Sequence, residues 1–175
     1  MYIEDIVKLN EKQNHFVTKT IYDKSFSWYF GHTDRACEYF YFGHHLMTVN
    51  KNSLPITGDV NSPHYEIAES IFLDFCNQNN ISVNTILRAA INTTTYSPEK
   101  YGVIHVDHEG FLHNNYIMYL NDFDEGHTYI FDDENNIEKV VNSKKNKAFV
   151  FDGKSHAQGF CLPNQKRTIL VFTFL

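Results

Sequence analysis

The chain has 175 residues, of which 42% are hydrophobic and 15% aromatic, so it suits one hydrophobic core and predicts a single domain over residues 1–175. Its formal net charge of −6 gives no overall positive field for indiscriminate nucleic-acid binding. Nucleic acid is therefore disfavoured as a partner, although it is not excluded.

The cysteines and the N-terminal residues indicate the compartment. Cys37, Cys76 and Cys161 are widely spaced and odd in number, which argues against a disulfide framework and for reducing surroundings. Neither a basic signal region nor a run of about 20 apolar residues is present. We therefore expect a cytoplasmic protein without a membrane partner.

Two helical segments are predicted in the first 80 residues. A short apolar stripe between Ile3 and Val7 indicates an N-terminal helical segment. Ser62 and Pro63 are typical of an N-cap followed by the first helical position, and apolar residues at helical spacing continue from there to about Cys76. The second helix should pack on the outside of a sheet.

Residues 26–47 are dense in aromatic side chains and histidine. Such a segment is more typical of side chains that complete a core around a barrel than of a surface that binds a base. One wall of a substrate cleft is the alternative.

Residues 83–93 predict a strand. Arg88 and Asn92 share one of its faces because their separation is even. We favour a solvated position at a barrel rim for this pair, and substrate contact is the alternative.

Residues 101–107 place a histidine and an aspartate two positions apart. Alternate side chains of a strand point to the same face, so in the strand predicted here His105 and Asp107 emerge side by side. One rigid element would thereby deliver two metal ligands. For an isolated His-x-Asp in a chain with ten histidines, a surface pair is the alternative.

A third ligand is available from His156, at the end of the segment 147–156, where an apolar strand runs into a short loop. Another strand is predicted over residues 168–175. Two histidines and one carboxylate occupy one face of an octahedral metal and leave the opposite face open, which is how Fe(II) binds a co-substrate and oxygen. Zinc more often has four closed ligands or three histidines, so the set favours iron.

Arg167 adds an anion anchor to this site. It lies 167 − 156 = 11 residues after His156, at the start of the last predicted strand. A guanidinium can pair with a carboxylate through two parallel hydrogen bonds, which the point charge of a lysine does less selectively. An acidic small molecule that reached from the metal to Arg167 would therefore be held at both ends.

In this order the residues resemble the 2-oxoglutarate and Fe(II)-dependent dioxygenases, and within them the prolyl-4-hydroxylase-like branch, which includes small phage-encoded members. The matching segments are His105-x-Asp107, Tyr116-Ile-Met-Tyr119-Leu-Asn121, Gly126-His-Thr-Tyr-Ile-Phe131, His156 and Arg167. The resemblance covers residues 85–175 well and the first 80 residues loosely. It departs from many relatives at Gly126-His127, where they carry two glycines before a Thr-x-Phe pattern.

The resemblance implies roles for two tyrosines. In the family, the tyrosine before Leu-Asn hydrogen-bonds the distal carboxylate of 2-oxoglutarate, which gives that role to Tyr119 with Arg167 as its partner. Tyr96 precedes His105 by nine residues and matches a tyrosine that relatives often turn toward the co-substrate, with core packing as the alternative. The implied cofactors are Fe(II), 2-oxoglutarate and O2, with ascorbate as an optional reductant.

The implied fold is mainly β with flanking helices: a double-stranded β-helix, the jelly-roll of cupin-like proteins. Residues 1–80 would give helical and aromatic support to a jelly-roll core over residues 81–175. The acidic run 132–136 predicts a turn between two strands. A solvated hairpin turn is expected around Lys144, Lys145 and Lys147.

The implied activity is oxidation, usually hydroxylation, of a C–H bond in a peptidyl or small-molecule substrate with release of succinate and CO2. One alternative is a jelly-roll module that binds metal or ligand without turnover, which would not need both an open metal face and a dicarboxylate anchor. Another is a zinc hydrolase on the same ligands, for which Glu109 or Glu125 would have to serve as general base. Solvent or substrate-pocket positions, rather than metal ligation, are expected for His108, His113 and His127.

The asparagine-rich and lysine-rich composition is in keeping with a viral source, and in that case the host cytoplasm is the expected compartment. The sequence does not indicate an oligomeric state.

Overall fold

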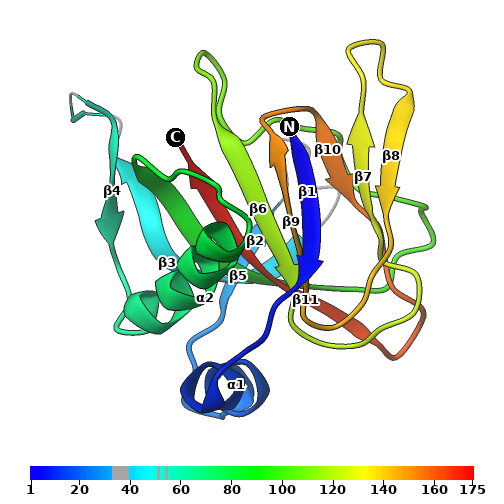
Figure 1. Ribbon diagram of the computed structural model, residues 1–175. Coiled ribbons are helices and arrows are strands. Elements are labelled where there is room, and N and C mark those ends of the chain that lie inside the picture. Colours follow the sequence, from blue (N-terminus) through cyan, green and yellow to red (C-terminus); the bar gives the residue numbers. More distant parts are fainter. Residues whose placement is uncertain (33–39, 51, 54) are drawn as a thin grey trace.

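Most of the regular secondary structure lies in antiparallel sheets (Figure 1). The computed structural model describes residues 1–32, 40–50, 52–53 and 55–175. Within these ranges the larger sheet has the spatial order β1 (Tyr2–Ile6), β9 (Lys147–Asp152), β6 (Asn114–Tyr119), β11 (Lys166–Phe174), β5 (Ile86–Thr95), β3 (Phe40–Asn50) and β2 (Tyr29–His32), and β4 (Thr57–Val60) pairs with β3. The smaller sheet has the order β10 (His156–Gln158), β7 (Thr128–Phe131) and β8 (Ile137–Val141). The predicted fold class, mainly β on a jelly-roll core, is confirmed.

Strand β11 lies at the centre of the larger sheet, where β5 pairs with it on one side and β6 on the other. Residues 167–174 are all buried, as expected for a strand that is covered on both faces. On one face, Phe172 stacks on Phe72 of helix α2 (Tyr65–Gln78). On the other face, Ile169 and Val171 line a cavity that faces the smaller sheet. The central strand therefore separates the helix-covered core from the candidate site.

The N-terminal apolar stripe forms strand β1, so the predicted helical segment is wrong at this point. β1 pairs along its whole length with β9, which would otherwise present an unpaired edge, and this pairing outweighs the helical spacing of so short a stripe. Helix α1 (Glu11–Thr18) follows, with Asn10 and Gln13 forming a reciprocal capping box, and a short 3-10 helix, η1 (Thr20–Tyr22), comes next. Gln13 also donates to Ser70 and Asp74, which joins α1 to α2.

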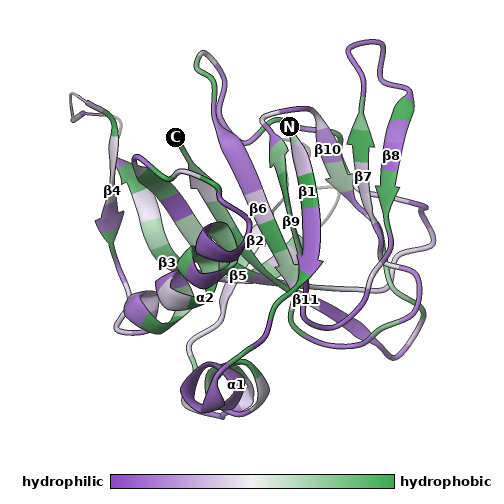
Figure 2. Ribbon diagram, in the orientation of Figure 1, coloured by the Kyte–Doolittle hydropathy of each residue, from purple (hydrophilic) through white to green (hydrophobic). Residues whose placement is uncertain are grey.

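Helix α2 begins two residues later than predicted. Its first residue is Tyr65 and its N-cap is His64, which makes no capping hydrogen bond through its side chain. Ser62 instead accepts the backbone N–H of His64 at 3.1 Å and bonds the His44 ring at 2.7 Å, so it stabilises the turn before the helix. The helix ends at Gln78, two residues beyond the predicted apolar spacing, and Asn80 just after it has a positive φ of 54°. The outward side of α2 is mostly hydrophilic (Figure 2).

The aromatic segment 26–47 completes the core only in part. Phe26 is buried and packs on Trp28, as predicted for a core segment. Other rings of the segment are exposed on β2 and β3, at the edge of the sheet: Tyr29, Phe30, Phe40 and Phe42. Residues 33–39, including Cys37, lie outside the described part of the chain.

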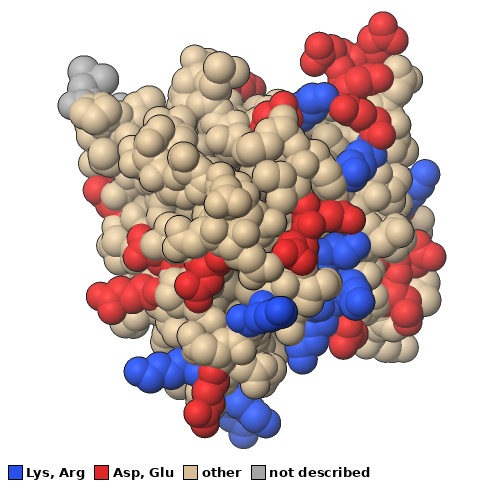
Figure 3. Space-filling view, in the orientation of Figure 1, with Lys and Arg blue, Asp and Glu red and all other residues tan. Residues whose placement is uncertain are grey.

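The two predicted turns have different outcomes. The acidic run 132–136 joins β7 to β8, as predicted, and forms an acidic projection at the upper right of Figure 3. The lysine-rich stretch 142–146 connects β8 to β9, which belong to different sheets. It is therefore a crossing between sheets, and the predicted hairpin turn is wrong.

Among the described cysteines, Cys76 and Cys161 are both buried free thiols. In the described ranges, neither helix has the length and apolar character needed to cross a bilayer.

The ring of Phe72 is the clearest test of the helix-covered core. It is fully buried, and its centroid lies 4.6 Å from that of Phe172. We expect Phe72→Ala to lower the free energy of unfolding by about 3–5 kcal/mol in urea titrations, because the cavity cannot collapse completely. Leu112→Ala is the control, since Leu112 is 94% exposed and its loss should cost less than about 0.5 kcal/mol. Equal effects of the two substitutions would contradict this description of the core.

Candidate metal centre

The segment 101–107 runs beside β10 without forming the predicted regular strand. Its pairing starts at Tyr101 opposite Gly159 and ends at His105 opposite His156. Over that stretch the segment advances 105 − 101 = 4 residues while its partner retreats 159 − 156 = 3. The extra residue is a bulge-like irregularity, which explains why the strand prediction fails here.

His105 and His156 are nevertheless locked opposite each other. The backbone N–H of His105 donates to the carbonyl of His156 at 3.0 Å, and the reverse bond is 2.9 Å. In such a hydrogen-bonded antiparallel pair the two side chains leave from the same face. Their rings accordingly lie with centroids 4.5 Å apart.

Both imidazoles are held by their Nδ1 atoms. Nδ1 of His105 lies 3.0 Å from the carbonyl oxygen of Val103, and Nδ1 of His156 lies 3.1 Å from that of Lys154. A carbonyl only accepts, so each Nδ1 must carry the proton, and each Nε2 then presents a lone pair. Orientation of a ligating histidine through its other nitrogen is typical of metal sites.

Asp107 completes a group of three. One ligand atom from each of His105, Asp107 and His156 can be chosen so that all lie within 4.8 Å of one another. Burial alone would raise the pKa of the Asp107 carboxyl, but His156, Arg88 and His105 hold that pKa at about 2. Burial lowers the pKa of the His156 imidazole to about 4. At neutral pH the pair is therefore an ionised carboxylate and a neutral imidazole, the forms that bind a cation.

Two adjoining cavities, with volumes of about 280 and 70 Å³, lie against these ligands. The larger is close to the lower end of the about 300–1,000 Å³ usual for ligand sites, which suits a small molecule. Both are lined by Arg88, Asn92, His105, Asp107, Gln158, Arg167 and Ile169.

Arg167 also lines both cavities. It is only 2% exposed; its Nε donates to the carbonyl of Gly126 at 2.9 Å and its Nη2 to Oγ1 of Thr128 at 3.0 Å. Among the described residues no carboxylate forms an ion pair with it, and burial lowers the pKa of its guanidinium. A buried charge without a counter-ion is costly, so the cavity favours an anion here.

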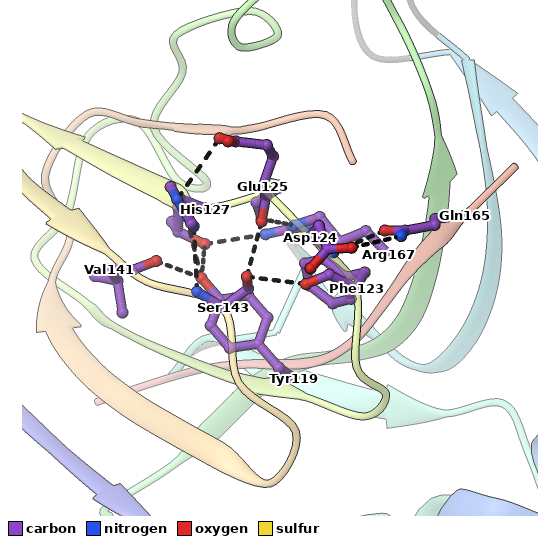
Figure 4. Close-up of polar contacts among 11 residues, drawn as sticks. Tyr119, Phe123, Asp124, Glu125, His127, Val141, Ser143, Gln165 and Arg167 are labelled. Atoms are coloured by element: carbon purple, nitrogen blue, oxygen red, sulfur yellow. Dashed lines mark hydrogen bonds and ion pairs between the residues drawn. The ribbon is translucent and has the colours of Figure 1, made fainter. Parts of the chain in front are cut away.

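Gly126 allows this arrangement. Its φ of +58° is one that L residues rarely adopt, and an added Cβ would lie 2.7 Å from the ring of Phe123. Gly126, which belongs to the segment that resembles the family, therefore allows the backbone conformation in which its carbonyl accepts a hydrogen bond from Arg167. The neighbouring His127 contacts Glu125 and Ser143 (Figure 4).

The structure brings Tyr119, but not Tyr96, to the anchor. Tyr119 is buried with its ring 5.6 Å from the Arg167 guanidinium; its hydroxyl donates to the carbonyl of Val141 and accepts from the N–H of Thr128 (Figure 4). Its oxygen does not line either cavity, so it supports Thr128 rather than facing the space itself. Tyr96 is 50% exposed and lines neither cavity.

Sequence reasoning missed several residues of the cavity wall. Arg88 and Asn92 line the larger cavity, so the predicted solvated position at a barrel rim is wrong. Buried polar atoms without a hydrogen-bond partner among the described residues occur on Asn92, Thr94 and Gln158, which is unusual unless a ligand or water binds them. The position of Gln158, two residues after His156 in β10, was the available signal.

The remaining histidines stay outside the three-residue group. His108 is buried with Nε2 2.7 Å from Oγ1 of Thr173, and His113 is buried against Gly153. Their burial corrects the expectation of solvent positions. Neither lines the two cavities at the ligands.

The sequence matches no protein-family model and no curated protein. Solved structures do match the fold. A 2OG-Fe(II) oxygenase family oxidoreductase from Burkholderia pseudomallei has a TM-score of 0.65 at 16% identity, over 85% of this chain and 72% of that one. A prolyl hydroxylase from Trichoplax adhaerens, in complex with a hypoxia inducible factor peptide fragment, has a TM-score of 0.62 at 10% identity, over 99% and 83%.

A viral protein is also among these structures. The collagen prolyl hydroxylase of Paramecium Bursaria Chlorella virus-1, in its 2OG complex, has a TM-score of 0.58 at 13% identity, over 98% of this chain and 94% of that one. At such identities the likeness shows a shared fold. The structural neighbours are therefore the 2-oxoglutarate and Fe(II) oxygenases that the sequence resembles.

Metal binding depends on Asp107 if the three-residue group is the site. We expect Asp107→Ala to show no binding of Fe(II), by anaerobic calorimetry, at concentrations that saturate the unmodified protein, because the group's one carboxylate is lost. Asp133→Ala is the charge-matched control in the exposed β7–β8 turn and should bind normally. Equal Fe(II) affinity of Asp107→Ala and the unmodified protein would rule out this centre.

Proposed function

We propose that this protein is an Fe(II)- and 2-oxoglutarate-dependent dioxygenase. The observation that carries the proposal is a small cavity lined by three converging metal-ligand side chains and by a buried arginine that has no carboxylate partner among the described residues. A dicarboxylic co-substrate suits this lining, because one carboxylate can bind the metal and the other the guanidinium.

The donor set fits Fe(II). His105, Asp107 and His156 supply two nitrogens and one oxygen from one side and leave the cavity side open. Both rings are already oriented by backbone carbonyls, so little ordering remains when a metal binds. When bound, iron would supply the activation of oxygen that no side chain of the protein can perform.

The protein's own residues would position the co-substrate and keep water away from it. Arg167 would pair with its distal carboxylate, and the hydroxyl of Thr94, which has no partner among the described residues, stands opposite Arg167 in the β5–β11 register. Tyr119 holds Thr128, which in turn bonds Arg167. The apolar side chains of Ile117, Ile169 and Val171 line the smaller cavity. They would cover the carbon chain that joins the two carboxylates of the co-substrate.

The alternatives are less well supported. A zinc hydrolase needs a general base near the metal, but Glu109 is exposed, Glu125 pairs with His127, and neither lines the two cavities. A module that only binds a ligand would not need the buried cation and the open metal face together.

A peptidyl or small-molecule substrate suits this site better than a nucleic acid. The chain carries a formal charge of −6, and a structural neighbour is a prolyl hydroxylase bound to a peptide fragment. The proposed reaction oxidises a C–H bond of such a substrate and converts 2-oxoglutarate and O2 to succinate and CO2.

Arg167 provides the test of co-substrate binding. We expect Arg167→Met to weaken 2-oxoglutarate binding to the Co(II)-loaded protein by about 1.5–3 kcal/mol, the range for a lost charge-assisted hydrogen bond, or roughly 10- to 150-fold in Kd by calorimetry. Co(II) affinity itself should not change, because Arg167 does not belong to the three-residue ligand group.

Lys166→Met is the matched control, since Lys166 is the exposed neighbour of Arg167. Thermal unfolding of both variants shows whether either has lost its fold. Normal 2-oxoglutarate affinity in a folded Arg167→Met protein would place the anchor elsewhere.

A further inference from the structure

The two oxygens of the Asp107 carboxylate have different surroundings. Oδ1 accepts a hydrogen bond from Nη1 of Arg88 at 2.9 Å, while Oδ2 lies 3.6 Å from Nε2 of His156. We infer that Arg88 is a positioning residue for the metal centre, which holds Oδ1 so that Oδ2 alone is presented beside the two imidazoles. This inference rests on the proposed metal site and assigns it a further residue.

Asp107 needs such support because its own backbone is irregular. The last backbone pairing of its segment is at His105, two residues earlier, and Asp107 is not in a strand. Among the described residues, Arg88 is the only hydrogen-bond donor to the side chain of Asp107. The backbone therefore fixes His105, whereas a side chain from another element fixes Asp107.

Arg88 comes from a rigid part of the larger sheet. It lies in β5, which pairs with β11 on one side and with β3 on the other, and it stands opposite Thr173 of β11. Its side chain is mostly buried and contacts Asp107 on the wall of the larger cavity, which both residues line. The contact therefore joins the larger sheet to the irregular segment beside the smaller one.

The consequence for the metal is a carboxylate that binds through one oxygen. A free carboxylate can bind through both oxygens and so take an additional coordination position. With Oδ1 engaged by a guanidinium in a charge-assisted bond, the three side chains supply three donor atoms and leave the opposite face open.

Simple electrostatics and the positioning role predict opposite effects of losing Arg88 on metal affinity. A guanidinium close to a divalent cation repels it, so charge alone would make removal of Arg88 strengthen metal binding. A role in contacting only the organic substrate would leave metal binding unchanged when no substrate is present. Only the positioning role predicts weaker binding by the protein and the metal alone.

The test compares the unmodified protein with Arg88→Met, which keeps an apolar stem, and with Arg88→Lys, which keeps the charge. Co(II) is titrated in the absence of 2-oxoglutarate, and both the Kd and the visible d–d spectrum are recorded. We expect Arg88→Met to bind Co(II) 10- to 100-fold more weakly, the usual effect of losing a residue that orients a ligand, and to show an altered spectrum. Arg88→Lys should lie between the two in affinity.

Lys144→Met, which removes an exposed positive charge, is the control and should match the unmodified protein. Thermal unfolding of the metal-free proteins identifies a variant that has not folded; should Arg88→Met fail, Arg88→Gln is compared in its place. Unchanged or tighter Co(II) binding with an unchanged spectrum in the folded variant would overturn the inference. Absence of Co(II) binding by the unmodified protein would instead overturn the proposed function.

Discussion

The candidate site depends on one pair of backbone hydrogen bonds, which holds His105 and His156 directly opposite each other. The two residues are 51 positions apart, and no regular strand carries the first of them. Because the pair is hydrogen-bonded in both directions, the two rings leave the backbone on the same side and at a fixed spacing. Each ring is then turned by a carbonyl two residues upstream, so that backbone groups set both imidazole positions.

The two arginines that line the cavities differ in whether a carboxylate of the protein balances their charge. Arg88 is paired with Asp107, the carboxylate of the ligand group, so this charge is balanced within the protein. Arg167 is buried deeper and has no carboxylate partner among the described residues. A protein that keeps such a cation on a cavity wall, oriented by Gly126 and Thr128, loses stability unless an anion binds there. The unbalanced charge therefore supports the proposed binding of an acidic co-substrate.

The sequence was sufficient to single out His105, Asp107 and His156, which the structure brings together, because spacing and residue type are local signals. The strand before His156 and the buried strand that carries Arg167 are strongly apolar, and both form as predicted. The prediction of a regular strand over residues 101–107 is wrong, because the segment has a one-residue irregularity. That irregularity depends on pairing with residues 156–159, which no local sequence pattern reveals. For the same reason, the helix predicted near Ile3 is wrong: this segment forms β1, because it pairs with the edge of β9, which is distant in the sequence. Arg88 could not be assigned from sequence, since its role depends on a contact 19 residues away across the cavity.

The most direct test of the account is an anaerobic titration of the metal-free protein with Fe(II) and then 2-oxoglutarate, followed by visible absorption. The proposed site predicts a weak charge-transfer band that requires both additions and disappears on admission of oxygen while succinate forms. Tight binding of zinc with no such band in the presence of Fe(II) and 2-oxoglutarate would contradict the account and favour a hydrolase or a binding module.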